Sequence, residues 1–204
     1  MAGDIVLWGA LNSGHSYKAR LYLLLAGVDH AYNRVDLSIP RAERPADFRA
    51  VSPYGEVPVL KHGPQVLAQS NAILLHLVRS CGKFGVEDAA GLDQITQWLF
   101  WEANRIGRSY PNYRYCRLLD PNVDPGLLGW FEATAKDDLA FMDQVLAEKD
   151  FLTGQFSVAD ISCAAYLLYG DLKRLELGDY AHVEAWLDRI RAMSGWQHPF
   201  EVMG

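Results

Sequence analysis

The chain has 204 residues, of which 50% are hydrophobic and 22% are charged, with a formal net charge of -6 and a pI near 5.5. This length suits one large domain or two small ones, and the apolar content is enough for the packed core of a soluble globular protein. The acidic balance argues against nucleic acid as a partner, since affinity for nucleic acids depends on basic patches.

Signals for targeting and for metal binding are missing from the sequence. No apolar run approaches the roughly 18 residues of a membrane-spanning helix, and residues 1–4 lack the basic region of a secretory signal. Cysteines 81, 116 and 163 form no CxxC pair, and the six histidines form no HExxH motif. We therefore expect a cytoplasmic protein that holds no metal and binds no membrane.

The first half begins as strand, loop and helix. The apolar run Ile5–Trp8 predicts a buried strand, and residues 10–16 form a small polar loop. A helix follows, which Gly27 ends as a left-handed cap and whose apolar residues recur at i, i+3, i+4 and i+7 as Leu21, Leu24, Leu25 and Val28. The positive end of its dipole points into the loop and favours an anion there.

A second parallel strand is expected over residues 31–37, and Pro45 then opens a short helix through Phe48. Residues 52–60 form a turn that runs into a strand containing Pro58. A proline there indicates either an edge or first position in the strand or a cis Val57–Pro58 bond, and the sequence leaves both open.

After a turn at residues 62–64, Ser70 is the expected N-cap of a helix that Gly82 ends. Residues 82–91 contain three glycines and two acids and predict a linker. Beyond it we expect helices only, with the aromatic segment 110–115 between two long ones. Ser157 and Asp160 predict a capping box, and a last helix passes through Trp186.

The order of these motifs resembles that of the soluble glutathione S-transferases, of the bacterial serine-type or a related class. The resemblance covers nearly the whole chain and rests on the Val57-Pro58 strand, the Gln69-Ser70 helix start and the capping box in an all-helical second half. It implies an α/β plus all-α fold. Residues 1–81 would form a thioredoxin-like domain of order βαβ-α-ββα, residues 82–91 the linker, and residues 92–204 an all-helical substrate-binding domain.

The resemblance also implies a site for glutathione as co-substrate. Val57, beside Pro58, would pair like a strand with the cysteinyl part, and Gln69 and Ser70 would hold the γ-glutamyl carboxylate. Arg44 would approach the glycyl end, unless it is only a solvated arginine. Glu56 lies where relatives carry Lys or Gln, and its charge would repel the carboxylates of the tripeptide.

The segment Ser13–Arg20 looks like the family loop Ser-x-x-Ser-x-Lys/Arg-Val-Arg that activates the thiol. It holds no cysteine for disulfide exchange, but a hydroxyl or imidazole donor there can stabilise the thiolate of a ligand. Ser13 is the first candidate, with His15 and Ser16 beside it. The alternatives are that either serine is only an N-cap and that His15 is a surface residue.

Trp98, Trp101, Tyr110 and Tyr113 would line an apolar pocket for a small hydrophobic electrophile, with a helix core or a dimer interface as the alternative role. Family members are usually two-fold dimers, so a homodimer is expected. Asp160 would serve stability. The implied function is glutathione transfer. Its rivals are a glutathione-dependent isomerase, dehalogenase or etherase, and a non-catalytic glutathione-binding or regulatory protein.

Overall fold

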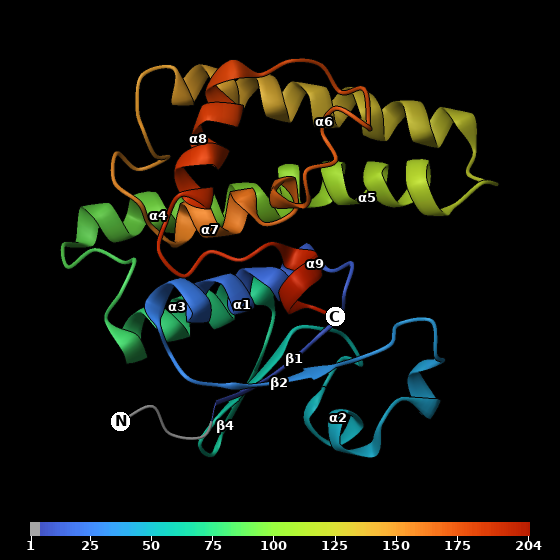
Figure 1. Cartoon of the computed structure of the whole chain (residues 1–204), viewed down its shortest axis with the longest axis vertical. Helices are drawn as coiled ribbons and strands as arrows, with labels where there is room; N and C mark the ends of the chain where they lie inside the picture. The colour runs from blue at the N-terminus through green and yellow to red at the C-terminus, as the bar shows by residue number, and fades with distance from the viewer. Residues whose placement is uncertain (1–4) are drawn as a thin grey trace. The chain divides into compact units, whose positions relative to one another are not determined.

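A computed structural model describes residues 5–204 (Figure 1). The expectations for residues 1–4, namely the lack of a signal and the start of the first domain, lie outside the described residues. The chain divides into two compact units. One contains the described residues up to Lys83 together with Met193–Gly204, and the other contains Phe84–Ala192.

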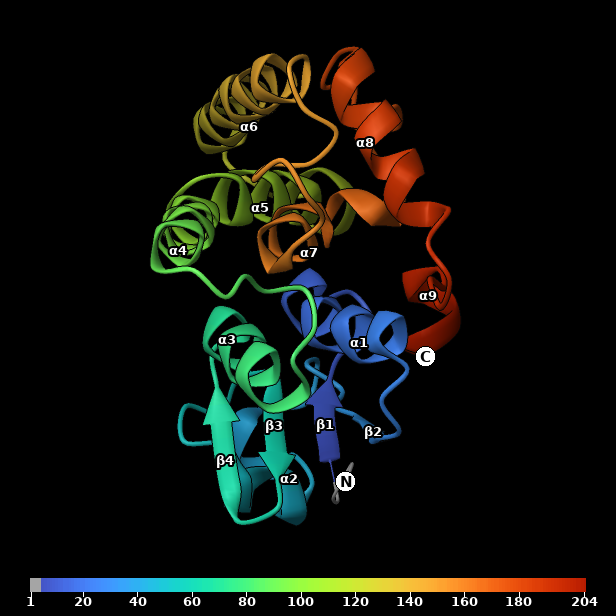
Figure 2. The same cartoon turned by 90° about the vertical axis from the view of Figure 1, so that its left-hand side faces the viewer.

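The N-terminal unit has the predicted βαβ-α-ββα order, so its thioredoxin-like fold is confirmed. The sheet has strand order β2-β1-β3-β4, with β1 parallel to β2 and antiparallel to β3 (Figure 2). Its elements are β1 (Ile5–Gly9), α1 (Gly14–Ala26), β2 (Ala31–Arg34), α2 (Ala46–Val51), β3 (Val59–His62), β4 (Gln65–Ala68) and α3 (Ser70–Cys81).

Successive side chains along each strand point to opposite faces of the sheet, and both faces are packed. Trp8 of β1 and Val59 of β3 pack with Phe48 of α2 on one face, so Leu7, which is fully buried, points to the other, where α1 and α3 pack together. Gly27 and Gly82 end these two helices in the left-handed conformation, as predicted, with φ of 64° and 69°.

The last segment, which includes α9 (Pro199–Val202), belongs to the N-terminal unit, whereas the prediction placed it in the helical domain. The Tyr17 hydroxyl donates to the carbonyl of Gln197 at 2.6 Å. A Cβ on Gly195 would lie 2.6 Å from the carbonyl oxygen of Leu24, so only glycine allows this approach. Such pairings between distant segments leave no periodic pattern in the sequence.

The second unit is helical, as predicted. It contains α4 (Ala89–Asn104), α5 (Ile106–Leu119), α6 (Pro125–Leu146), α7 (Val158–Ala164) and α8 (Ala181–Arg191). The placement of residues 110–115 between helices was wrong, because they lie inside α5 with Pro111. The chain breaks earlier, at Arg105, whose φ of -120° and ψ of -105° are not helical. Among residues 5–204, no helix has the length and hydropathy to cross a bilayer.

The capping box at the start of α7 is confirmed. The amide of Ser157 donates to Asp160 Oδ2 at 2.9 Å, and Asp160 Oδ1 accepts from the Leu152 amide and from Trp186 Nε1, each at 2.9 Å. Burial raises the pKa of Asp160, and these hydrogen bonds oppose that shift. The carboxylate thus joins the turn before α7 to α8 in the core of the unit.

Candidate functional site

The predicted site residues of the N-terminal unit come from three segments at one end of the sheet. Trp8 pairs with Val59, and Val59 pairs with Ala68, so the end of β1, the start of β3 and the end of β4 lie side by side (Figure 2). From this end extend the loop before α1, the Val57–Pro58 bond and the Gln69-Ser70 start of α3. The sheet register therefore brings the three predicted segments together.

Ser13 is the N-cap of α1, and its Oγ accepts two hydrogen bonds from Ser16. One comes from the Ser16 amide at 3.1 Å and the other from the Ser16 hydroxyl at 3.0 Å. A serine oxygen has two acceptor positions and one hydrogen. With both acceptor positions occupied, the Ser13 hydroxyl is set up to donate its hydrogen, and a thiolate is a suitable acceptor.

Ser16 is completely buried and also accepts from the Ala10 amide at 3.4 Å. A Cβ on Gly9 would lie 2.8 Å from the Cβ of Ser16, so a glycine at position 9 leaves the space that Ser16 fills. Ser16 therefore contacts Ser13 and backbone, and its predicted catalytic role stays a prediction. His15, the second residue of α1, is half-buried, and its predicted role in thiolate binding stays a prediction.

The Val57–Pro58 peptide bond is cis, which decides between the two readings of that proline. Pro58 is buried and Val57 is partly buried against the cluster around Trp8. Glu56 is exposed and forms an ion pair with Arg41 across 3.5 Å, with 52% and 65% of the two side chains exposed. The charge of Glu56 thus has a partner of opposite sign that the sequence alone did not indicate.

Gln69, not Ser70, is the N-cap of α3, so that prediction was one residue late. Gln69 has a φ of 70°, a conformation that non-glycine residues adopt rarely and that is enriched at functional sites. Ser70 is the first residue of the helix and is 9% exposed. Its Oγ accepts a hydrogen bond from Lys18 Nζ at 3.3 Å. Its amide and hydroxyl thus lie at the positive end of the helix dipole.

Arg44 is 8% exposed, and its guanidinium donates to three backbone carbonyls. These are Ile39 at 3.1 Å, Gly55 at 2.7 Å and Leu37 at 3.3 Å. The side chain therefore holds the loop after β2 against the turn before Glu56. The predicted contact with a glycyl carboxylate stays a prediction, and it would have to use the remaining N–H groups of Arg44.

The four aromatic residues predicted for a substrate pocket separate into two pairs. Trp98 and Trp101 line a pocket of about 470 Å³ in the helical unit, together with Phe141 and Lys149. The ring centroids of Trp101 and Phe141 are 5.4 Å apart. Sequence reasoning did not include Phe141 and Lys149, because they lie far along the chain from the tryptophans, and the substrate role of the pocket stays a prediction.

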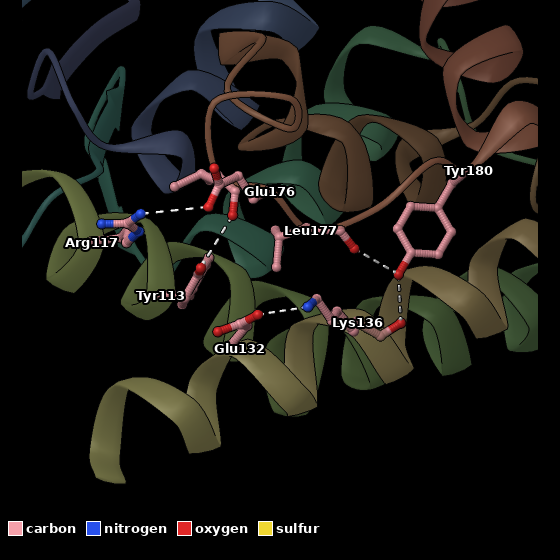
Figure 3. Close-up of polar contacts among 8 residues, drawn as sticks. Tyr113, Arg117, Glu132, Lys136, Glu176, Leu177 and Tyr180 are labelled. Atoms are coloured by element: carbon pink, nitrogen blue, oxygen red, sulfur yellow. Dashed lines mark hydrogen bonds and ion pairs between the residues drawn. The ribbon is translucent and has the colours of Figure 1, made fainter. Parts of the chain in front are cut away.

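Tyr110 and Tyr113 lie in the core of the helical unit instead, with 0% and 3% of their surfaces exposed. The Tyr113 hydroxyl donates to the carbonyl of Leu175 at 3.1 Å, next to the Arg117–Glu176 ion pair (Figure 3). Burial raises the pKa of the Tyr110 hydroxyl. Tyr113 thus holds α5 against the segment before α8, and neither tyrosine lines this pocket.

Sequence reasoning gave no role to Lys18, although it lies within the loop motif. The side chain is completely buried, and the periodicity of α1 does not show that it reaches the start of α3. Arg41, the partner of Glu56, was missed for the same reason, since the pair depends on how a loop folds back.

The fold and the site together define a class of protein. Its members have a thioredoxin-like domain, in which hydroxyl groups replace the CxxC pair at the start of α1, followed by a helical domain. Residues 12–80 match the family model described as the N-terminal domain of glutathione S-transferase. The chain is 26% identical over 186 residues to the disulfide-bond oxidoreductase YfcG of Escherichia coli (strain K12). The alignment covers 87% of this chain and 86% of the relative.

Two solved structures are also similar. A possible glutathione S-transferase from Rhodopseudomonas palustris has 29% identity and a TM-score of 0.78, covering 96% of this chain and 97% of that one. A glutathione transferase family member from Pseudomonas fluorescens, solved with two glutathione molecules bound, has 20% identity and a TM-score of 0.83, covering 96% and 91%. The second likeness concerns the fold alone. Residues 12–80 are thus a glutathione S-transferase N-terminal domain, and the chain as a whole is similar to proteins of that family.

Proposed function

We propose that the protein binds glutathione at this end of the sheet and activates its thiol for transfer to an apolar electrophile. Ser70 and Gln69 receive the γ-glutamyl carboxylate, and the Val57 backbone pairs with the cysteinyl part. The glutathione bound to the Pseudomonas fluorescens family member supports this ligand, and the names of several relatives support the reaction.

The main observation behind the proposal is that Ser13 Oγ already accepts two hydrogen bonds, from the amide and the hydroxyl of Ser16, so its own hydrogen is left to donate. A hydroxyl that donates to a thiolate stabilises the charged form and lowers the pKa of the thiol. The thiolate then attacks an electrophilic carbon, a sulfur–carbon bond forms, and the leaving group departs with its electron pair. The thiol proton goes to solvent before the attack.

The test is a pH titration of the ultraviolet absorbance of bound glutathione thiolate in the wild type, Ser13→Ala and His15→Ala. We expect a bound thiol pKa below that of free glutathione and a rise of about one to two pH units in Ser13→Ala, which is the loss of one charge-assisted hydrogen bond. Ser80→Ala, which removes an exposed hydroxyl of α3, is the matched control. An unshifted thiol in the wild type contradicts the proposal.

A second candidate is disulfide reduction, favoured by the name of the Escherichia coli relative. Residues 10–17 contain no cysteine, so the thiols must come from glutathione. One glutathione thiolate attacks the disulfide, releases a thiolate and leaves a mixed disulfide. A second glutathione resolves it, so that two glutathiones are oxidised while one disulfide is reduced to two thiols. Turnover of a small dialkyl disulfide, with none of a chloronitrobenzene, selects this function. Binding without turnover of either indicates a non-catalytic glutathione-binding protein.

The proposal includes a two-fold homodimer in the cytoplasm. Exposed apolar side chains of the helical unit support the dimer: Phe100 is 73% exposed, Trp130 51% and Phe141 44%. Sedimentation equilibrium should give twice the 22.9 kDa chain mass, and Phe100→Glu should weaken the association. A wild-type protein that sediments as a monomer at micromolar concentration contradicts this part.

A further inference from the structure

The last segment of the N-terminal unit contacts two tyrosines that border the loop before α1. The Tyr17 hydroxyl donates to the carbonyl of Gln197 at 2.6 Å, and the Tyr32 hydroxyl donates to the carbonyl of Met203 at 3.4 Å. The first bond is short and the second is long, so Tyr17 is the stronger attachment. Burial raises the pKa of Tyr32 to about 12, so this hydroxyl keeps the hydrogen that it donates. The segment that includes α9, which runs beside α1 in Figure 2, is therefore held at two points.

Tyr17 belongs to the same helical turn as the two serines of the loop. It has no exposed surface and follows Ser16 directly in α1. Its amide donates to the carbonyl of Ser13 at 2.9 Å, which is the hydrogen bond that joins the N-cap residue to the helix. A displacement of the Tyr17 backbone would therefore change the contacts of 3.1 Å and 3.0 Å between Ser16 and Ser13 Oγ.

Tyr32 borders the space that Ser16 fills. A Cβ on Gly9 would lie 3.0 Å from both Cε2 and the hydroxyl oxygen of Tyr32, and 2.8 Å from the Cβ of Ser16. The two side chains thus meet beside Gly9. The Tyr32 ring forms one wall of the space in which Ser16 lies, and its bond to Met203 keeps the ring there.

From these contacts we infer that Tyr17 and Tyr32 are positioning residues for thiol activation, and that the segment Met193–Gly204 fixes both of them. They act through the Ser13–Ser16 pair and not by contact with the ligand. Because a hydrogen bond weakens steeply as it departs from its preferred angle, the Ser13 hydroxyl stabilises a thiolate fully only when the pair is held in one orientation. The inference rests on the proposed function and goes beyond it, because it makes thiol activation depend on residues far from the loop in the sequence.

The test is the pH titration of bound glutathione thiolate in the wild type, Tyr17→Phe and Tyr22→Phe. Tyr22 is the matched control, because it lies in the same helix, is also fully buried, and donates to the carbonyls of Leu77 and Lys83. We expect Tyr17→Phe to raise the thiol pKa by about 0.3–1 pH units, which is part of the rise expected for Ser13→Ala, and Tyr22→Phe to leave it unchanged. In the Ser13→Ala background, Tyr17→Phe should cause no further rise, since the tyrosine acts through that serine.

Gly195→Ala provides an independent test that leaves both tyrosines in place. The new Cβ would lie 2.6 Å from the carbonyl oxygen of Leu24, so the substitution displaces the segment. We expect a rise in the thiol pKa like that of Tyr17→Phe, and a double variant in which the two rises do not add. If Gly195→Ala does not fold by circular dichroism, Tyr32→Phe replaces it, with a smaller rise because its bond is longer.

A Tyr17→Phe protein that unfolds at a lower urea concentration than the wild type but keeps its thiol pKa overturns the inference, because the tyrosine is then structural only. An equal rise in Tyr22→Phe also overturns it, since any loosening of α1 would then have the same effect. Either result leaves the proposed function intact, because the thiol of the wild type is still activated. A wild type whose bound thiol has the pKa of free glutathione contradicts the proposed function and the inference with it.

Discussion

Replacing Ser16 with alanine separates thiol activation from stability. Ser16 has no exposed surface, and its hydroxyl makes one bond to Ser13 Oγ at 3.0 Å and one from the Ala10 amide at 3.4 Å. Loss of two neutral hydrogen bonds should lower the free energy of unfolding by about 1–2 kcal/mol. Ser13 keeps its own contact with the thiolate but loses the neighbour that polarises its hydroxyl, an effect of about 10–30% of one bond.

A charge-assisted bond of about 1.5–3 kcal/mol then weakens by a few tenths of a kcal/mol, and the thiol pKa should rise by about 0.2–0.5 units. Thiolate absorbance against pH measures that shift, and urea denaturation measures the stability. The reasoning fails if Ser16→Ala raises the thiol pKa as much as Ser13→Ala, because Ser16 would then contact the ligand itself. It also fails if the thiol pKa does not move.

Three further predictions concern stability. Asp160→Asn should lower the free energy of unfolding, measured by urea denaturation, by about 2–4 kcal/mol, because an amide group cannot accept all the hydrogen bonds that the carboxylate accepts. A change near zero in this free energy contradicts the prediction. Burial, with Arg20 Nη1 donating to His30 Nε2 at 2.7 Å, lowers the pKa of His30. Its stabilisation is therefore complete above the ordinary value of about 6.5 and is lost as pH falls through the lowered folded pKa. The stability difference between wild type and His30→Gln should shrink from about pH 7.5 to pH 5, and a constant difference would refute this. Among residues 5–204 the buried Tyr110 hydroxyl has no hydrogen-bond partner, so Tyr110→Phe should stabilise by about 1 kcal/mol; a lower melting temperature in calorimetry argues against it.

The N-terminal fold was readable because its signals are local. Gly27 and Gly82 end helices in a conformation that glycine tolerates best, and the apolar run at Ile5–Trp8 has the length of a strand. The thioredoxin-like topology itself came from the resemblance to a family. Pro111 misled the prediction, since a proline usually breaks a helix, whereas here the break lies at Arg105.

The candidate site was only partly readable, because its roles depend on which side chains meet. The sequence placed Ser13 at a helix start but did not show that both of its acceptor positions are filled by Ser16. Aromatic residue type favoured Tyr110 and Tyr113 as strongly as the tryptophans, and only packing separates the buried pair from the pair in a pocket. Residue type indicates what a side chain can do, and burial decides whether a ligand reaches it.

The charge of Glu56, next to the predicted ligand-binding residue Val57, should act only weakly on a bound ligand. Glu56 and Arg41 are both more than half exposed, so water and salt screen each of them and their pair contributes little. The repulsion that the sequence predicts between Glu56 and the carboxylates of the ligand is therefore weakened by solvent and salt.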